Sequence, residues 1–243
     1  MFDFTQFWHA IGHQLSRPSG IRGRLLGHVM AYVNEQPNRE AIQSLDIGPS
    51  DIILELGFGP GRAIETLVSK TPHGKVFGID PSEEMVAQAS RTNRRWIDSG
   101  RVRLMQGYFN VLPWQSGTID KILAVNVVYF FHESGAELRE ARRLLKPGGE
   151  MAIYATDKSS MSQWKFAGPE THLLFDRDGL TSLIIRGGFG VDEFFIREIA
   201  FAYGVIGLIA TLRKRSSAFE FADGKGSASH PSRENDDLSS GCH

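Results

Sequence analysis

The sequence predicts an α/β fold of the doubly wound kind, built on a mainly parallel sheet. Short, nearly continuous apolar runs recur from residue 51 onward, and such runs are typical of strands that are covered on both faces. Segments with helical patterning and clear start or stop signals separate these runs. A strict alternation of strand and helix favours parallel strands joined by helical crossovers.

The expected strands of the parallel part are apolar runs that follow one another along the chain. They cover residues 52–56, 75–79, 101–105, 119–128 and 151–154. The run at 119–128 is long and almost wholly apolar, so we expect it to be buried on both faces of the sheet.

Helices are expected between these strands, at residues 60–70, 82–97 and 134–145. Ser82 is a good N-cap residue, and Glu83 and Glu84 follow in the first turn, where the helix dipole favours negative charge. The sequence Lys-Pro-Gly-Gly at 146–149 is a stop signal for the third helix.

The pattern changes after residue 154. A further helix is expected at residues 178–186, closed by two glycines. Two strands, at 191–196 and 199–212, follow this helix and can pair with each other. We therefore expect an antiparallel hairpin added to the edge of the sheet.

Composition excludes several classes of protein. The 27 Lys and Arg residues balance 28 Asp and Glu residues to a net charge of -1, so no global basic field would collect nucleic acid. Cys242 is the only cysteine, which excludes a disulfide framework and a thiolate zinc site and suits a reducing, cytoplasmic compartment. No apolar run reaches the ~18–20 residues that span a bilayer, and the N-terminus lacks the pattern of a secretory signal.

The strongest functional signal is a glycine-rich turn, Leu-Glu-Leu-Gly-Phe-Gly-Pro-Gly at 54–61, between the first strand and the first helix. Glycines allow a sharp turn and leave room for a ligand against bare main chain, and the helix behind them presents free N–H groups. Asp80 ends the next strand, where an acid can accept both hydroxyls of a ribose. Together these features predict an adenosine-type cofactor at the sheet's switch point.

The identity of that cofactor follows from a resemblance. The segments 55–61 and 78–85 resemble motifs I and II of class I S-adenosylmethionine-dependent methyltransferases, and 145–149 resembles the turn before that family's fifth strand. The resemblance covers roughly residues 45–155, and within the family it is strongest to the small-molecule branch that includes ubiquinone/menaquinone-biosynthesis-like enzymes. The alternative is another nucleotide-binding domain such as a dehydrogenase, whose G-x-G-x-x-G fingerprint places the third glycine one position later.

The resemblance implies a Rossmann-like methyltransferase fold, with a seven-stranded sheet, N-terminal helices and a C-terminal antiparallel hairpin. It divides the chain into an N-terminal helical cap over the active site (1–45), a methyltransferase core that binds S-adenosylmethionine (46–214) and a tail expected to be disordered (215–243). The implied cofactor is S-adenosyl-L-methionine, and the product left after transfer is S-adenosyl-L-homocysteine.

The resemblance also implies roles for individual residues. Glu55 would help to hold the amino end of the cofactor, and Asp80 would take the ribose hydroxyls. The loop expected under the methionine and ribose portions contributes Gly57, Phe58, Gly59 and Gly61, and the residues expected near the adenine are Pro81 and Met85.

Two positions after the third and fourth strands complete this set. Many relatives carry a Gly-Asp-Ala-like triplet whose Asp meets the adenine amino group, whereas this chain has Gly107, Tyr108 and Phe109. Backbone N–H groups could serve instead, with an aromatic ring on the adenine, and plain core packing is the alternative for these aromatics. Asn126 ends the fourth strand, where family members place a backbone carbonyl near the methionine amine.

Methyl transfer requires mainly that the acceptor be held in line with the S–CH3 bond, about 3 Å away, with water excluded. Some acceptors must also lose a proton. His132 is the preferred base candidate because imidazole titrates near neutral pH, and Tyr129 lies in the same segment. The alternative for His132 is a surface or helix-entry histidine. Asp157 is a weaker candidate, and its alternative is an acid in a loop.

The acceptor is expected to be a small, fairly apolar metabolite, methylated on O, N or C. The residues expected to close its pocket are Phe4, Phe7, Trp8, Met30 and Tyr32, and those that would hold an acidic group are Arg17, Arg22 and Arg24. Phe4, Phe7 and Trp8 also fit simple packing on the domain or peripheral contact with a membrane.

Other functions stay open at this point. The spacing of Asn126 and Tyr129 matches the Asn-Pro-Pro-Tyr motif of base-amine methyltransferases, although the prolines are missing and the net charge counts against nucleic acid. Methylation of lipid head groups and a cofactor-binding domain without turnover are further alternatives. The sequence leaves the oligomeric state undetermined.

Overall fold

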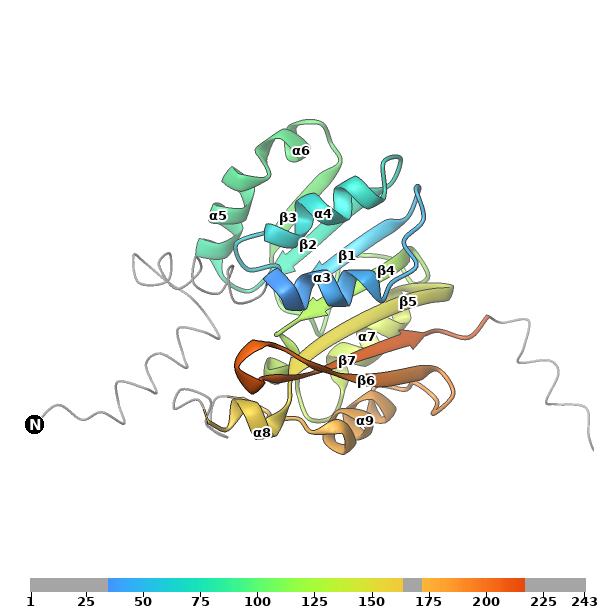
Figure 1. Ribbon diagram of the computed structural model, residues 1–243. Helices are drawn as coiled ribbons and strands as arrows, with labels where there is room; N and C mark the ends of the chain where they lie inside the picture. The colour runs from blue at the N-terminus through green and yellow to red at the C-terminus, as the bar shows by residue number, and fades with distance from the viewer. Residues whose placement is uncertain (1–34, 164–171, 217–243) are drawn as a thin grey trace, which may run out of the picture.

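A computed structural model describes residues 35–163 and 172–216, and its centre is a seven-stranded sheet in the order β3-β2-β1-β4-β5-β7-β6 (Figure 1). The strands are β1 (Ile52–Leu56), β2 (Lys75–Asp80), β3 (Val102–Gln106), β4 (Ile119–Val125), β5 (Leu145–Thr156), β6 (Phe194–Ala200) and β7 (Ile206–Arg213). The aromatic and arginine residues predicted to surround the acceptor, from Phe4 to Tyr32, lie outside the described residues, as does the tail from residue 217.

Strands β3, β2, β1, β4 and β5 pair in parallel, and β7 pairs antiparallel with both β5 and β6. The predicted mainly parallel sheet with an antiparallel hairpin is therefore confirmed. The predicted bounds of the hairpin strands were wrong. Residues 201–205 form a turn that contains the 3-10 helix η2 (Ala202–Gly204), so β6 begins and ends later than predicted and β7 begins at Ile206.

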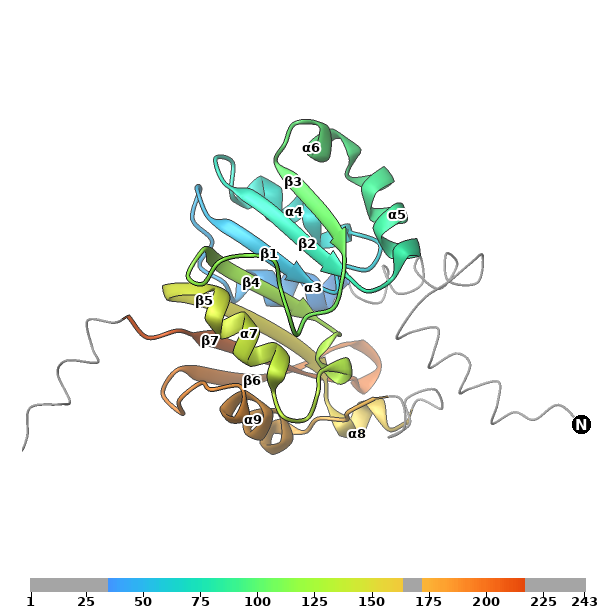
Figure 2. The same cartoon turned by 180° about the vertical axis from the view of Figure 1, so that it is seen from behind.

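Helices cover both faces of the sheet (Figures 1 and 2). One face carries α3 (Glu35–Gln43), α4 (Arg62–Lys70) and α5 (Glu83–Thr92), and the other carries α7 (Ala136–Leu144) and α9 (Arg177–Arg186). Shorter elements are α6 (Arg94–Asp98), η1 (Val128–Phe130) and α8 (Lys158–Met161). Among the described residues, no helix combines the length and the apolar character needed to cross a membrane.

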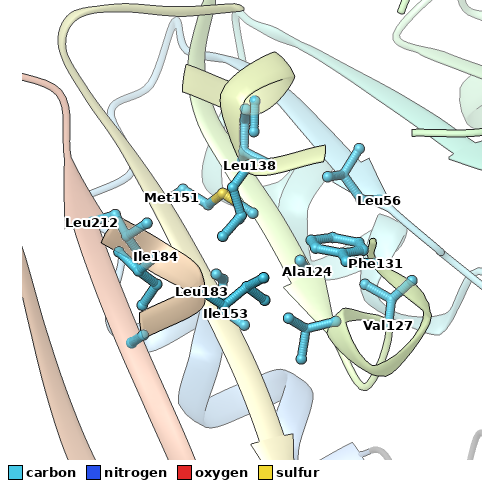
Figure 3. Packing of buried hydrophobic residues seen from close by; sticks show 14 of the residues in the cluster. Leu56, Ala124, Val127, Phe131, Leu138, Met151, Ile153, Leu183, Ile184 and Leu212 are labelled. Carbon is cyan, nitrogen blue, oxygen red and sulfur yellow. The ribbon is translucent and has the colours of Figure 1, made fainter. Parts of the chain in front are cut away.

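The alternation of side chains along the central strands builds a core on each face. In β4, Ile122 and Ala124 join the cluster under α7 and α9, whereas Leu123 and Val125 join the cluster under α3 and α4. Figure 3 shows the first of these clusters, with side chains of both helices over β4 and β5. Because β4 is buried on both faces, its near-continuous apolar sequence is explained.

The helix predicted at 82–97 is broken into α5 and α6 at Asn93. The N-cap role of Ser82 is confirmed, since its Oγ accepts a hydrogen bond from the N–H of Met85 at 3.3 Å. Asn93 is buried, and its Nδ2 donates to the carbonyls of Ala89 and Gly61, each at 3.0 Å. The side chain thus closes α5 and ties it to the glycine-rich turn.

Two strands also differ from their predicted lengths. β4 ends at Val125 rather than at residue 128, because Asn126 has a positive φ of 55° and the chain enters η1. β5 begins at Leu145, directly after α7, instead of at residue 151. The register between β4 and β5 shifts between Ile119 and Lys121, which accommodates the Pro-Gly-Gly segment as a bulge.

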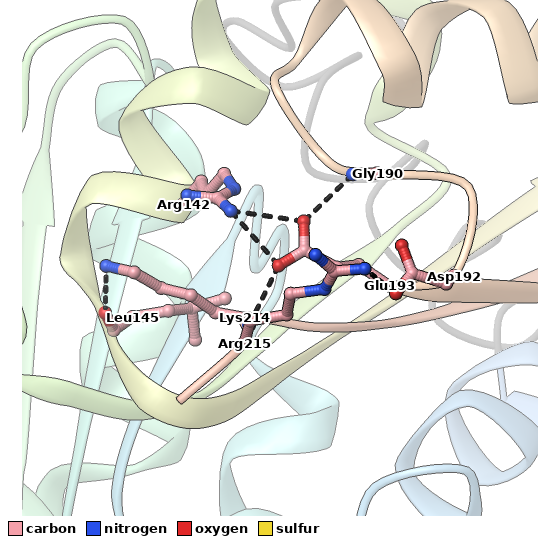
Figure 4. Close-up of polar contacts among 7 residues, drawn as sticks. All are labelled: Arg142, Leu145, Gly190, Asp192, Glu193, Lys214 and Arg215. Carbon is pink, nitrogen blue, oxygen red and sulfur yellow. Dashed lines mark hydrogen bonds and ion pairs between the residues drawn. The ribbon is translucent and has the colours of Figure 1, made fainter. Parts of the chain in front are cut away.

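A buried carboxylate fixes the amino edge of the sheet (Figure 4). Both oxygens of Glu193 lie 3.0–3.1 Å from Nη2 of Arg142 on α7, and they accept main-chain N–H bonds of 2.8 Å from Gly190 and Arg215. Burial alone would raise the pKa of this carboxyl, but these donors hold the pKa below its ordinary value. The contacts join α7, the turn before β6 and the end of β7.

Candidate functional site

The predicted site lies at the carboxyl edge of the parallel strands, and the arrowheads of β1 to β4 in Figure 2 mark that edge. The chain passes from β1 to β2 on one side and crosses to β4 on the other, so the gap between β1 and β4 is the topological switch point. The glycine-rich turn follows β1 at this point. Ligands of open α/β sheets bind in the crevice formed there.

The three glycines of the turn have left-handed backbones, with φ of 67° at Gly57, 52° at Gly59 and 75° at Gly61. Their surroundings differ. A Cβ atom on Gly57 would lie 2.6 Å from Cγ2 of Val127, and one on Gly61 would lie 2.7 Å from Cβ of Ala89. A Cβ on Gly59 would meet no atom within 4 Å. Gly57 and Gly61 are therefore required by packing, whereas Gly59 faces open space.

The remaining member of the turn, Phe58, is buried and belongs to the core. Its ring packs over β2, where a Cβ on Gly78 would lie 2.6 Å from Cδ1 of Phe58. The carbonyl of Phe58 accepts the N–H of Gly61 at 2.9 Å, which closes the turn. The side chain thus anchors the turn from beneath.

Asp80 ends β2 and lies beside the turn. Its Oδ2 accepts the N–H of Gly59 and its Oδ1 accepts the N–H of Ser82, both at 2.9 Å. Burial raises the pKa of this carboxyl to about 6, although the two N–H donors act in the opposite direction. Each carboxylate oxygen can still accept a second hydrogen bond.

Glu55 lies in β1, with 4% of its surface exposed. Its Oε2 has no hydrogen-bond partner, and burial, with a smaller contribution from the charge of Asp80, raises the pKa of this carboxyl to about 8. A buried acid without a partner for one oxygen is suited to a cationic group. S-adenosylmethionine carries a nucleoside and an ammonium group. The open space at Gly59 would admit the first and the unpaired oxygen of Glu55 would suit the second, so these residues fit this cofactor.

The predicted adenine contacts lie at the ends of β2 and β3. Met85 is buried and Pro81 is half-buried. The N–H of Gly107 donates to the carbonyl of Asp80 at 3.0 Å, so this segment continues alongside β2. Tyr108 is 61% exposed, whereas Phe109 belongs to the core.

The two aromatic residues thus separate into different roles. The centroid of the Phe109 ring lies 5.9 Å from that of Phe131. Phe109 therefore fits the alternative of plain core packing. Tyr108, with its exposed ring, is the one of the pair that stays available to a ligand.

Asn126 and Tyr129 are joined to each other. The hydroxyl of Tyr129 donates to Oδ1 of Asn126 at 2.9 Å and accepts the N–H of Thr156 at the end of β5. Burial raises the pKa of Tyr129 above its usual range, so this phenol stays protonated. The predicted cofactor residue Asn126, which is half-buried, and the catalytic candidate Tyr129, which is buried, are therefore linked by a hydrogen bond.

His132 lies apart from that pair, in an exposed turn before α7. Its Nδ1 is 2.8 Å from Oγ of Ser134, and its own N–H donates to the Glu137 carboxylate at 2.9 Å. Asp157 caps α8, because its Oδ1 accepts the N–H of Ser159 at 2.8 Å. The loop-acid interpretation of Asp157 thus matches its position.

Two residues near the site were missed by sequence reasoning. Nδ2 of Asn93 donates a hydrogen bond to the carbonyl of Gly61. The signal in the sequence that could have identified it is an Asn in the middle of a helical pattern. His172 is buried beside Tyr129 and Phe130, with ring centroids at 6.0 and 5.0 Å, and burial lowers its pKa to about 4. No sequence pattern pointed to His172. Within the described residues, no three His, Cys, Asp or Glu side chains group as metal ligands.

The fold is that of an open α/β sheet with a glycine-rich turn at its switch point, and comparison with known proteins identifies the family. A profile described as "Methyltransferase domain" matches residues 53–149. The uncharacterized methyltransferase YdaC of Bacillus subtilis is 33% identical over 129 residues, which cover 53% of this chain and 69% of YdaC.

Two further comparisons agree. Trans-aconitate 2-methyltransferase of Rhodopseudomonas palustris is 28% identical over 165 residues, covering 63% of this chain and 59% of that protein. A solved SAM-dependent methyltransferase from Aquifex aeolicus matches with a TM-score of 0.57 and 21% identity over 72% of this chain and 89% of its own. The chain belongs to the class I S-adenosylmethionine-dependent methyltransferases, and its cofactor is S-adenosylmethionine, with S-adenosylhomocysteine as product.

Proposed function

We propose that this enzyme transfers the methyl group to O, N or C of a small, fairly apolar metabolite. The proposal of an apolar acceptor rests on the aromatic cluster at the carboxyl ends of β4 and β5. The rings of Phe130, His172 and Phe175 surround Tyr129 with centroid distances of 6.0–6.5 Å. Residues 126–131 and 154–156 carry no charged side chain. An acceptor bound there would meet carbon and aromatic surface.

In this proposal, the β1–β2 side of the crevice holds the cofactor. Glu55 pairs with its ammonium group, Asp80 accepts its ribose hydroxyls, and the bare main chain at Gly59 allows close approach. Pro81, Met85 and Tyr108 flank the adenine. When bound, S-adenosylmethionine supplies a methyl group on a positively charged sulfur. The chain's own residues then bind and orient the cofactor and the acceptor and exclude water, which is most of what this reaction requires.

A base is needed only where the acceptor carries a proton that must leave. We propose His132 for that role, because imidazole is the side chain that most readily exchanges protons near neutral pH, and the N–H of Ser134 donates to its Nδ1 at 3.2 Å. His132→Ala would slow turnover of an acceptor that loses a proton and leave cofactor affinity unchanged. An unaltered rate across the pH range would remove His132 from the mechanism.

One relative favours a second candidate acceptor. Trans-aconitate 2-methyltransferase is named for an acceptor that carries carboxylates, and it matches 63% of this chain. We therefore include carboxylic acids in the acceptor test, beside phenols, quinols and amines. Methylation of an acid by this enzyme would move the proposed acceptor class from apolar to anionic. The resemblance to the ubiquinone branch stays a prediction that the same panel tests.

The first experiment is calorimetric titration with S-adenosylmethionine, S-adenosylhomocysteine and, as a control, NAD. We expect micromolar binding of the first two and none of NAD. Formation of S-adenosylhomocysteine is then measured with each acceptor of the panel. Binding of NAD alone would contradict the cofactor assignment to this site. Cofactor binding without turnover of any acceptor, including those in a metabolite extract, would favour a domain that binds the cofactor without catalysis.

A further inference from the structure

The turn after β4 has an unusual backbone. Asn126 has φ of 55°, and among the described residues it is the one non-glycine residue with a positive φ. This conformation is strained for L-residues, although Asn tolerates it better than most. Such a residue persists only when the surrounding structure holds it in place. The contacts of Asn126 therefore show what maintains this turn.

Two connections to β5 hold the turn. The N–H of Asn126 donates to the carbonyl of Tyr154 at 3.0 Å. Its Oδ1 accepts the hydroxyl of Tyr129, which in turn accepts the N–H of Thr156. One phenol oxygen thus links the turn after β4 to the end of β5 through a donated and an accepted hydrogen bond.

The ring of Tyr129 is itself fixed. It is 5% exposed and stacks on Phe175 with a centroid distance of 6.5 Å and an interplanar angle of 26°. The carbonyl of Tyr129 accepts the N–H of Leu173 at 3.0 Å. Because ring and main chain are both held, the hydroxyl has a defined position from which to hold Asn126.

The same turn shapes the cofactor loop. Val127 follows Asn126 directly, and its Cγ2 lies 2.6 Å from the place where a Cβ of Gly57 would be. A change in the backbone of Asn126 would move Val127 against the glycine-rich turn. The position of the turn after β4 is therefore coupled to the loop that faces the cofactor.

We propose that Tyr129 is a positioning residue whose hydroxyl holds Asn126 in its left-handed conformation and thereby sets the geometry of the cofactor loop. This inference rests on the proposed function and replaces proton transfer as the role of Tyr129. The hydroxyl proton is committed to Asn126, and its loss would leave two acceptors facing each other. Tyr129 acts through Asn126 and Val127 rather than on the reacting atoms.

The test is the affinity for S-adenosylmethionine of Tyr129→Phe, measured by calorimetry. This variant keeps the ring and removes the hydroxyl, and we expect a Kd weaker by about 5- to 30-fold. The matched control is Tyr154→Phe, an equally buried tyrosine whose hydroxyl is 3.5 Å from Oγ1 of Thr156. We expect the control to bind within about twofold of the wild type.

A second background separates positioning from simple packing. Glycine adopts a positive φ without strain, so Asn126→Gly should keep the turn without the tether. Tyr129→Phe made in that background should change the Kd by less than about twofold, which a packing defect would not produce. Equal losses in both backgrounds, or a lower Tm with an unchanged Kd, would overturn the proposal.

Asn126 provides an independent route if Tyr129→Phe does not fold. Asn126→Ala removes the acceptor and disfavours a positive φ, so we expect it to bind more weakly than Asn126→Gly, which adopts a positive φ without strain. Equal affinity of the two variants would overturn the proposal. Absence of binding by the wild-type protein would instead contradict the proposed function, so the two failures are distinguishable.

Discussion

Oδ2 of Asp80 accepts a 2.9 Å hydrogen bond from the N–H of Gly59, so the acid that ends β2 and the loop that follows β1 form one structural unit. The N–H of Ser82 completes the unit by donating to Oδ1 at 2.9 Å. Asp80 therefore has two tasks in the proposed site. It holds the loop with one set of lone pairs and offers the other set to the ribose.

Asp80→Ala should consequently weaken S-adenosylmethionine binding by about 1.5–3 kcal/mol, the usual loss for hydrogen bonds to a charged group. Asp80→Asn should also weaken it, because its amide would point N–H groups at one of the two backbone donors. Calorimetry measures both. Glu83→Ala, an exposed acid in the first turn of α5, is the control and should bind normally. Unchanged affinity of Asp80→Ala would show that the ribose is placed wrongly.

The glycines of the turn give a prediction that separates binding from stability. Gly59→Ala should lower the free energy of unfolding by only about 1–2 kcal/mol, the cost of a left-handed alanine, while its methyl group obstructs the cofactor. Gly61→Ala should cost about 2–5 kcal/mol, because the new Cβ also lies 2.7 Å from Cβ of Ala89. Urea denaturation and calorimetry measure the two effects.

A third glycine supplies the control for this comparison. Gly117 has φ of 66° and no atom within 4 Å of an added Cβ, and it precedes β4 at the opposite edge of the sheet. Gly117→Ala should show the same backbone strain as Gly59→Ala with normal cofactor affinity. Weakened binding in both variants would mean that strain alone explains the loss at Gly59.

Glu55 should make cofactor binding depend on pH. Its pKa of about 8 in the ligand-free protein means that it is largely protonated at neutral pH. An ammonium group favours the ionised carboxylate, so binding should release a proton and tighten as pH rises from 6 to about 8, by at most about tenfold per unit. Calorimetry in buffers of different ionisation enthalpy measures this proton. Glu55→Gln should abolish the part of the release that Glu55 supplies, and an identical release in that variant would contradict the assignment.

The same pKa determines a stability trend without cofactor. The folded protein binds more protons at Glu55 than the unfolded chain does between about pH 4.5 and 8. The free energy of unfolding should therefore fall as pH rises through that range. Asp80 acts in the same direction up to about pH 6, because its pKa is also raised.

Glu193 should contribute to stability and not to binding. Glu193→Gln should lower the free energy of unfolding by about 1.5–3 kcal/mol, because it weakens the bonds to Arg142 and to two backbone donors. Glu198→Gln, in an exposed 3.4 Å ion pair with Arg177, should cost about 0–1 kcal/mol. Both variants should bind S-adenosylmethionine normally. A change in Kd at Glu193 would contradict its placement at the edge remote from the site.

The sequence was sufficient to predict the sheet and the glycine-rich turn after β1, because both depend on local signals. The two-sided burial of β4 appears as a continuous apolar run, and the turn after β1 requires glycine at three positions. The break at Asn93 and the bulge at the start of β5 were not predictable. Each depends on a contact with a distant segment, Gly61 in one case and β4 in the other.

The roles of the site residues show the same limit. Three glycines look equivalent in the sequence, yet only the structure distinguishes Gly59, which faces open space, from its neighbours, which pack against Val127 and Ala89. Tyr129 was a candidate for catalysis because of its position after β4. Its bonds to Asn126 and Thr156 are set by the packing of β4 beside β5, which no local pattern encodes.

The order of the last two strands has a consequence for synthesis on the ribosome. β7 occupies the place between β5 and β6, so β6 emerges before the strand that joins it to the sheet. Until residue 213 has left the exit tunnel, β5 keeps an open hydrogen-bonding edge and the cluster under α9 lacks Leu208, Ala210 and Leu212. The nascent chain therefore completes this core only after β7 has emerged, and a ribosome stalled before β7 would hold an aggregation-prone intermediate.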